Sequence, residues 1–184
     1  LALDDCTAQI AFWQRHLDTR RFGAALRVMF SVTALRAIYS SPLLRCLPPR
    51  LAMVMRGRLE RGFANHPNRH NVYARALLLG ELAAPAPVSV ADRITLVHAD
   101  AAEWLENAPA GSLDGFSLSN ILDGANDAYR ARLGAAVRKA AAPGAMVVLR
   151  SFSEPDAAMT SNCATADRSM LWGIVDVRPA DQFD

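Results

Sequence analysis

Short polar side chains follow three apolar, β-rich segments of this 184-residue chain, and they are the residues best placed to do chemistry. Parallel sheets bind ligands at the carboxyl ends of their strands, so these side chains are expected to line one polar crevice. Taken singly, Asp100 and Asn120 could also be simple helix caps. Three such ends together favour a site. Its expected members are Asp100 after residues 94–98, Ser119, Asn120 and Asp123 after residues 113–119, and Arg150 and Ser151 after residues 145–150.

The elements that position these side chains alternate between strand and helix in residues 83–184. Asn126 or Asp127 can cap a helix that Pro143-Gly144 would stop. This alternation predicts an α/β domain with a mostly parallel sheet. The expected strands are residues 94–98, 113–119, 145–150 and 171–177, and the expected helices are residues 101–107 and 127–142.

Residues 1–82 are expected to form a separate, helical and basic segment. Residues 1–75 carry twelve arginines against four acidic residues, a net charge of +8, whereas residues 76–184 have a net charge of −6. Apolar residues recur at helical spacing, with Asp4 or Asp5 as the first cap. The helices expected from this spacing are residues 5–18, 22–39 and 50–63, with a further stop or start at Ser41-Pro42.

Three interpretations of this basic segment remain open. It can be ordinary helix packing with solvated arginines, or an interfacial membrane helix whose apolar side chains insert into lipid. The side chains expected to insert are Phe22, Leu26, Met29 and Phe30. A nucleic-acid module is the third interpretation, but the arginines lack aromatic residues interleaved at a module spacing, so no nucleic-acid partner is expected.

Composition excludes several classes of protein. An apolar fraction of 52% with 21% charged residues excludes an intrinsically disordered chain. Three widely spaced cysteines exclude a disulfide-stapled scaffold and favour a reduced, cytoplasmic setting. No uncharged apolar run reaches the roughly 18 residues of a membrane-spanning helix. The cysteines and histidines form no pattern typical of a metal site, so no metal is expected.

The order of motifs in the acidic half resembles the second half of a class I S-adenosylmethionine-dependent transferase, which has a Rossmann-like sheet. The motifs are an Asp100-Ala101 strand end, a short helix with Trp104-Leu105, and Leu113-Asp-Gly-Phe leading into Ser119-Asn120. This resemblance implies that Asp100 and Ala101 contact the adenine of the co-substrate. It places Ser119, Asn120 and Asp123 at the reacting end.

Longer segments resemble the BtaA-like family of S-adenosylmethionine:diacylglycerol 3-amino-3-carboxypropyltransferases. The resemblance implies betaine-lipid synthesis, in which the aminocarboxypropyl group moves to the free hydroxyl of diacylglycerol and methylthioadenosine is released. It also implies a cytoplasmic protein held peripherally at an anionic membrane. The segments that carry it are residues 12–17, 68–80, 98–105, 113–122 and 167–172.

Such a transfer needs a base for the hydroxyl proton and strict alignment, but no metal, because the sulfonium is already a good leaving group. The candidate bases are His70, Asp123 and Tyr73, with His66 as a further possibility. Asn71, which lies with Tyr73 in the most family-like segment, and Arg168 are expected to contact substrate. Arg150 is expected to hold the co-substrate carboxylate, although Arg150 and Arg168 could instead pair with Asp123 or Asp167.

One departure from the resemblance is serious. The chain has no G-x-G turn for the methionine end of the co-substrate and no acid after a second strand for the ribose. Residues 94–98 and 113–119 would then lack the strands that normally lie between them. Because Leu1 is not a methionine, we expect either a lost N-terminal half-domain or a decayed relative. The alternatives are a small-molecule methyltransferase, which would release S-adenosylhomocysteine, and a non-catalytic lipid- or partner-binding relative.

Overall fold

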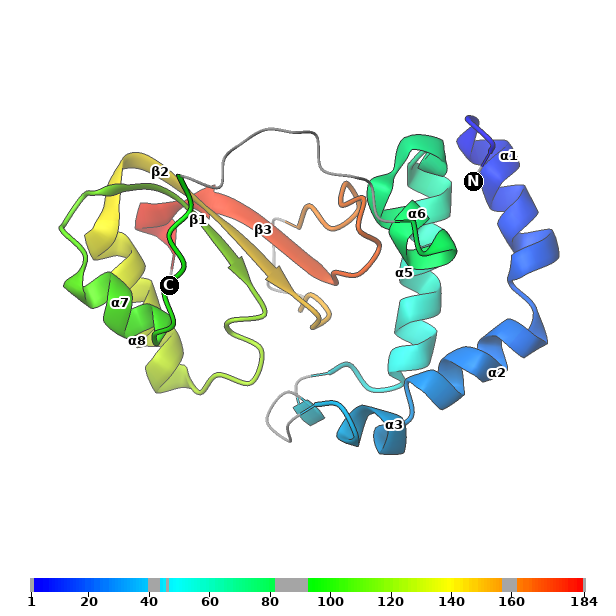
Figure 1. The fold of residues 1–184 in the computed structure, drawn as a ribbon, viewed down its shortest axis with the longest axis horizontal. Coiled ribbons are helices and arrows are strands. Elements are labelled where there is room, and N and C mark those ends of the chain that lie inside the picture. Colours follow the sequence, from blue (N-terminus) through cyan, green and yellow to red (C-terminus); the bar gives the residue numbers. More distant parts are fainter. Residues whose placement is uncertain (1, 40–43, 46, 82–92, 157–161, 184) are drawn as a thin grey trace.

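A computed structural model describes residues 2–39, 44–45, 47–81, 93–156 and 162–183. Helices fill the N-terminal half, and a small sheet with two helices fills the C-terminal half (Figure 1). In the N-terminal half the elements are α1 (Cys6–Phe12), a π-helical turn (Trp13–Leu17), α2 (Arg20–Met29), α3 (Val32–Arg36), α5 (Leu51–Asn65), a 3₁₀ turn (Asn68–His70) and α6 (Val72–Leu79).

Side-chain caps set the helix boundaries of the N-terminal half. The carboxylate of Asp5 accepts hydrogen bonds from the Thr7 and Ala8 amides and begins α1, as predicted. The single helix predicted over residues 22–39 is wrong, because the Ser31 hydroxyl accepts a hydrogen bond from the Ala34 amide at 3.2 Å. That cap starts α3 as a new helix after α2.

An aromatic cluster holds the N-terminal half together. The ring of Trp13, which is 1% exposed, stacks on Phe63 at 4.7 Å and meets Phe22 edge-on at 5.4 Å. Leu26 is also buried. Phe22 and Leu26 therefore serve packing, which corrects the expectation that they insert into a membrane.

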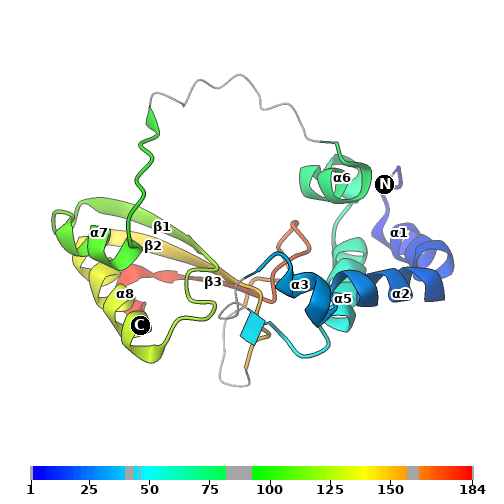
Figure 2. The same cartoon turned by 60° about the horizontal axis from the view of Figure 1, so that its bottom comes forward.

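The C-terminal half is a two-layer α/β unit with a mixed sheet. The strand order is β1-β2-β3, in which β1 and β2 are parallel and β3 is antiparallel to β2, so the mostly parallel expectation is wrong for the described strands. Helices α7 and α8 lie together on one side of the sheet (Figure 2). The elements are α7 (Ala101–Asn107), β1 (Leu113–Ser119), α8 (Asp127–Ala140), β2 (Ala141–Ser151), β3 (Ile174–Pro179) and a 3₁₀ turn (Ala180–Gln182).

Alternation along β1 decides which side chains enter the core. Phe116 and Leu118 are buried, whereas Ser117 between them is exposed. The buried pair packs in one cluster with Leu133 and Val137 of α8. This packing leaves the carboxyl ends of β1 and β2 pointing toward α3 and α5 (Figures 1 and 2).

Residues 94–98 do not form the predicted strand. They have no regular secondary structure and are exposed, and Leu96 is 92% exposed. A strand requires a neighbour for its backbone hydrogen bonds, and β1 pairs only with β2 among the described strands. The β-rich composition of residues 94–98 is therefore present without the pairing that would make it a strand.

Candidate functional site

A hollow of about 330 Å³ lies where the carboxyl ends of the parallel strands meet the helical half. This is the place at which the sequence predicted a crevice. Its walls are apolar apart from Asn120 and the hydroxyl of Tyr39. The lining residues from the helical half are Phe30, Leu35, Tyr39, Leu47, Leu51 and Met55, and those from the other half are Asn120, Phe152 and Leu171.

Asn120 is the polar group that the end of β1 offers to this hollow. Its backbone has a φ of 58°, a left-handed conformation that asparagine tolerates better than most residues. Its backbone N–H donates a hydrogen bond to the Arg150 backbone carbonyl at 2.9 Å and so continues the ladder between β1 and β2. Its side-chain oxygen is buried and has no hydrogen-bond partner among the described residues. That oxygen is available to accept a hydrogen bond from a ligand.

Asp123 joins the ends of β1 and β2. One carboxylate oxygen accepts a hydrogen bond from the Ser151 hydroxyl, and the other accepts from the Phe152 amide at 3.1 Å. The backbone N–H of Asp123 donates to the backbone carbonyl of Asn120 at 3.1 Å. Asp123 therefore positions both Asn120 and Phe152 at the hollow, and both of its oxygens already accept hydrogen bonds.

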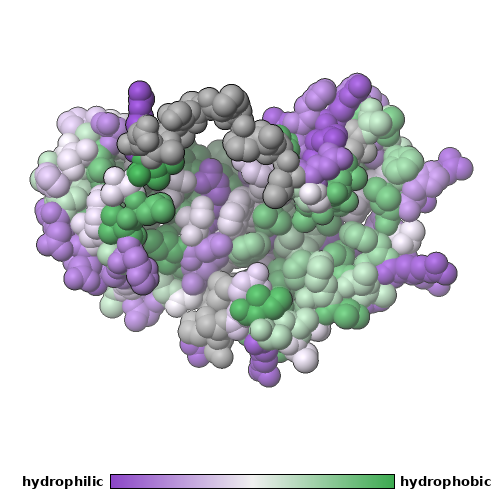
Figure 3. All heavy atoms as spheres, viewed as in Figure 1, coloured by the Kyte–Doolittle hydropathy of each residue, from purple (hydrophilic) through white to green (hydrophobic). Residues whose placement is uncertain are grey.

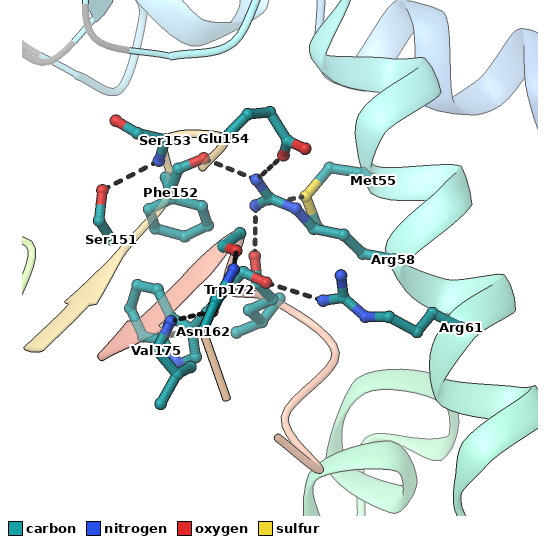
Figure 4. A network of polar contacts seen from close by, with 12 residues as sticks. Met55, Arg58, Arg61, Ser151, Phe152, Ser153, Glu154, Asn162, Trp172 and Val175 are labelled. Atoms are coloured by element: carbon teal, nitrogen blue, oxygen red, sulfur yellow. Dashed lines mark hydrogen bonds and ion pairs between the residues drawn. The ribbon is translucent and has the colours of Figure 1, made fainter. Parts of the chain in front are cut away.

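Arg58 on α5 fastens the loops of the C-terminal half to the helices (Figure 4). Its side chain is 3% exposed. Its guanidinium donates to the Leu171 carbonyl at 2.5 Å and to the Phe152 carbonyl at 2.7 Å, and it forms an ion pair with Glu154. Since Phe152 and Leu171 both line the hollow, Arg58 is a positioning residue of the site. The sequence pattern does not distinguish it from the other arginines of the basic helices.

Asp100 and Ala101 lie at the start of α7, where the helix-cap interpretation of Asp100 is confirmed. The Asp100 carboxylate accepts a hydrogen bond from the Glu103 amide at 2.9 Å and lies 3.6 Å from the Arg132 guanidinium. The Glu103 hydrogen bond is the main reason why the pKa of Asp100 lies below its usual value. Ala101 is the first residue of the helix and is half-buried.

Ser119 and Arg150 face each other across the parallel strands. They are register partners at the ends of β1 and β2. The Arg150 guanidinium donates to the Ser117 hydroxyl at 3.1 Å. It forms no ion pair with Asp123, so that structural alternative is wrong. Arg150 lies at the end of β2, and Asn120 directly follows the neighbouring strand β1.

The remaining predicted site residues form a separate group beside α6. Asn71 is buried: its amide nitrogen donates to the Asn68 side chain at 2.7 Å and to the Arg168 carbonyl at 2.8 Å, and its oxygen caps α6. The Arg168 guanidinium donates to the His70 backbone carbonyl at 3.4 Å. Among the described residues Arg168 forms no ion pair with Asp167, whose carboxylate accepts a hydrogen bond from the Ser169 hydroxyl. Tyr73 is exposed.

The structure therefore divides the predicted site among three places. Within residues 2–39, 44–45, 47–81, 93–156 and 162–183, no hydrogen bond or ion pair joins the Asn71 group to Asp100 or Asp123. Of the predicted site residues, Ser119, Asn120, Asp123 and Arg150 gather at the strand ends. The family-like segment around Asn71 acts in the described structure as a buried polar connection between α5, α6 and the loop that contains Arg168.

Neither a metal-binding cluster nor a membrane-spanning helix occurs among the described residues. No group of three or more His, Cys, Asp or Glu side chains in them is arranged to hold a metal ion. None of the helices formed by these residues has the length and apolar character needed to cross a membrane.

The fold and site define a mixed α/β protein with a hollow at its strand ends. Compared with protein-family models, with curated proteins and with solved structures, the chain matches none of them.

Proposed function

We propose that this chain carries the lipid-facing part of an S-adenosylmethionine-dependent transferase that alkylates the free hydroxyl of diacylglycerol with a 3-amino-3-carboxypropyl group. One observation carries the proposal: the hollow at the strand ends has a polar wall at Asn120 and apolar walls from arginine-rich helices. A reaction between a polar, charged donor and a lipid hydroxyl needs such a boundary. The family resemblance supplies the identity of the donor and acceptor.

The proposed reaction is a substitution at carbon. The hydroxyl oxygen forms a bond to the carbon of the aminocarboxypropyl group, and the bond from that carbon to the sulfonium breaks. The electron pair stays on sulfur, so methylthioadenosine leaves, and the hydroxyl proton passes to a base. Asp123 is the candidate base that is hydrogen-bonded to residues of the hollow: its carboxylate accepts from the Phe152 backbone N–H, and its backbone N–H donates to the Asn120 backbone carbonyl.

The described residues fit the reacting end of the co-substrate better than its nucleoside end. The buried oxygen of Asn120 can accept a hydrogen bond from the ammonium group of the methionine portion. Asp100, which the resemblance assigns to the adenine, already caps α7 and lies beside Arg132. The proposal therefore assigns Asn120 and Asp123 to the reaction, and leaves the glycine-rich cradle to residues outside this sequence.

The first experiment identifies the nucleoside product. The longest natural protein that contains this chain is incubated with S-adenosylmethionine and diacylglycerol, and the products are analysed by mass spectrometry. Methylthioadenosine with a new ether lipid would support the proposal. S-adenosylhomocysteine would instead support the methyltransferase alternative. The absence of both products and of co-substrate binding would support a non-catalytic relative.

Asp123→Asn tests the base. The substitution is expected to abolish transfer, because an amide cannot take the hydroxyl proton. Asp127→Asn is the matched control, since Asp127 is an exposed acid only four residues further along the chain, in the first turn of α8. Near-normal turnover of Asp123→Asn would remove Asp123 from the mechanism.

The proposal includes peripheral attachment to an anionic membrane surface. No aspartate or glutamate occurs between Thr19 and Leu59, whereas eight arginines do. Arginines near an anionic surface contribute about 1 kcal/mol each. Val28 and Met29 of α2 are more than half exposed, and they replace Phe22 and Leu26 as the apolar side chains able to enter the interface.

A further inference from the structure

A second and larger hollow, about 810 Å³, shares the apolar wall of the candidate site. Phe30, Leu35, Leu47 and Leu51 line both hollows, so the two cavities adjoin. The larger volume is within the range of about 300–1,000 Å³ that is typical of small-molecule sites. Its walls come from the end of α2, from α3, and from the residues that lead into α5.

The rim of this large hollow is cationic. Arg27, Arg36, Arg45 and Arg50 line it, and all four are exposed. None of the four forms an ion pair with a described residue. By contrast, Arg56 on the neighbouring α5 pairs with Asp18. The positive charge at the rim is therefore available to an anion from outside the chain.

Apolar side chains are exposed beside the same arginines. Val32 and Met53 line the large hollow and are 61% and 62% exposed. In Figure 3, hydrophobic residues gather over α2 and α3 along the lower part of the molecule, with hydrophilic residues projecting beyond them. An apolar cavity with a cationic rim and an apolar margin matches an amphiphile that has an anionic head.

We propose that the large hollow binds an acyl chain of an anionic membrane phospholipid, whose phosphate lies among the four rim arginines. The apolar walls remove the chain from water, and the unpaired guanidinium groups complement the phosphate. This inference deepens the proposed function, on which it rests only for placing a lipid acceptor in the adjoining hollow. The bound phospholipid holds the mouth of the smaller hollow at the membrane, where diacylglycerol resides.

Vesicle flotation of the protein, without S-adenosylmethionine, tests this binding. We expect flotation with vesicles of phosphatidylcholine and phosphatidylglycerol, and much weaker flotation with phosphatidylcholine alone. Arg36→Gln with Arg45→Gln is expected to lower the binding constant about fivefold for each arginine removed. No dependence on phosphatidylglycerol would overturn the proposal.

Filling the hollow separates insertion of a chain from surface attraction. Ala52→Trp places a large side chain in the hollow, and Ala64→Trp places it on an exposed position of the same helix. We expect Ala52→Trp to lower the binding constant at least tenfold and Ala64→Trp to leave it unchanged. Equal binding by the two variants would overturn the proposal. If circular dichroism shows that Ala52→Trp is unfolded, the smaller Ala52→Leu gives the same comparison.

Two further controls identify the source of the lipid and separate the two proposals. Dodecanoate, used below its micellar concentration, is expected not to release the protein from vesicles. If dodecanoate released the unsubstituted protein but not Ala52→Trp, the ligand would be a free fatty acid, and the membrane source would be overturned. Flotation without methylthioadenosine formation would refute the proposed function alone. Methylthioadenosine formation with equal flotation of Ala52→Trp and Ala64→Trp would refute the phospholipid site alone.

Discussion

Replacing Arg58 with methionine removes the group that fastens two wall residues of the candidate site to α5. Methionine keeps much of the apolar stem that packs inside the helical half, but it cannot donate hydrogen bonds. The carbonyls of Phe152 and Leu171 lose their guanidinium partner, and Glu154 loses its ion pair. We therefore expect both a less stable protein and a loosened hollow.

The size of the effect follows from the partners of Arg58. Each hydrogen bond from a charged donor contributes about 1.5–3 kcal/mol, and the two backbone carbonyls of Phe152 and Leu171 are partly buried. The Glu154 carboxylate is 52% exposed, so solvent screening limits that ion pair to less than about 1 kcal/mol. Arg58→Met should therefore lower the free energy of unfolding by roughly 3–6 kcal/mol.

Urea denaturation, monitored by circular dichroism, measures this loss in the free energy of unfolding. Arg56→Met is the matched control, because Arg56 lies two residues away on α5 and its ion pair with Asp18 is exposed to solvent on the arginine side. We expect the control to lose less than about 1 kcal/mol. If Arg58→Met costs no more than Arg56→Met, the assignment of Arg58 as the connection between the two halves is wrong.

Three other substitutions test separate features. In α5, Gly57→Ala should raise the free energy of unfolding, measured in urea titrations, by about 0.5–1 kcal/mol. Gly62→Ala should lower it, because Met170 crowds position 62 but not position 57. Equal effects would contradict this packing. Leu96→Glu should change stability by less than about 0.5 kcal/mol and reduce light scattering from self-association, and a larger loss would mean that Leu96 is packed. The backbone N–H of Glu103 holds the pKa of Asp100 below its usual value, so the ionised Asp100 stabilises the folded protein above about pH 4, the ordinary pKa of an aspartate. This stabilisation is lost as the pH falls further, and an acid titration of Asp100→Asn should lack that loss.

Local patterns predicted those elements whose boundaries depend on nearby residues. Residues 113–119 form β1 and residues 101–107 form α7, with the bounds that the sequence indicated. Alternating burial and a cap within three residues determine both elements. The helix predicted over residues 127–142 ends instead at Ala140, because β2 already begins at Ala141.

Features that depend on distant residues could not be predicted in this way. Arg58 looks like any solvated arginine of a basic helix, but its partners are the carbonyls of Phe152 and Leu171, about a hundred residues away. Every residue has a backbone carbonyl that can accept a hydrogen bond, so the sequence does not show which carbonyls Arg58 contacts. Residues 94–98 failed for a related reason, since a strand is defined by its neighbour as much as by its own side chains.

Part of the candidate site was predictable, and part was not. Strand ends placed Asn120, Asp123 and Arg150 correctly at one edge of the sheet. The apolar wall that faces them comes from the helical half, which helix periodicity alone does not orient. The sequence predicts that the polar residues around Asn71 contact substrate, yet in the described structure their side chains form hydrogen bonds with one another and with backbone groups.

The outer edge of β1, where the described sheet ends, has a consequence for how this protein must be handled. Its backbone N–H and C=O groups can accept a strand from any chain that supplies one, including another molecule of the same protein. Association at that edge would follow mass action, so the apparent melting temperature would rise with protein concentration. A stability measured at one protein concentration therefore reflects both separate and associated molecules. A dilution series is needed to obtain the stability of the separate molecule.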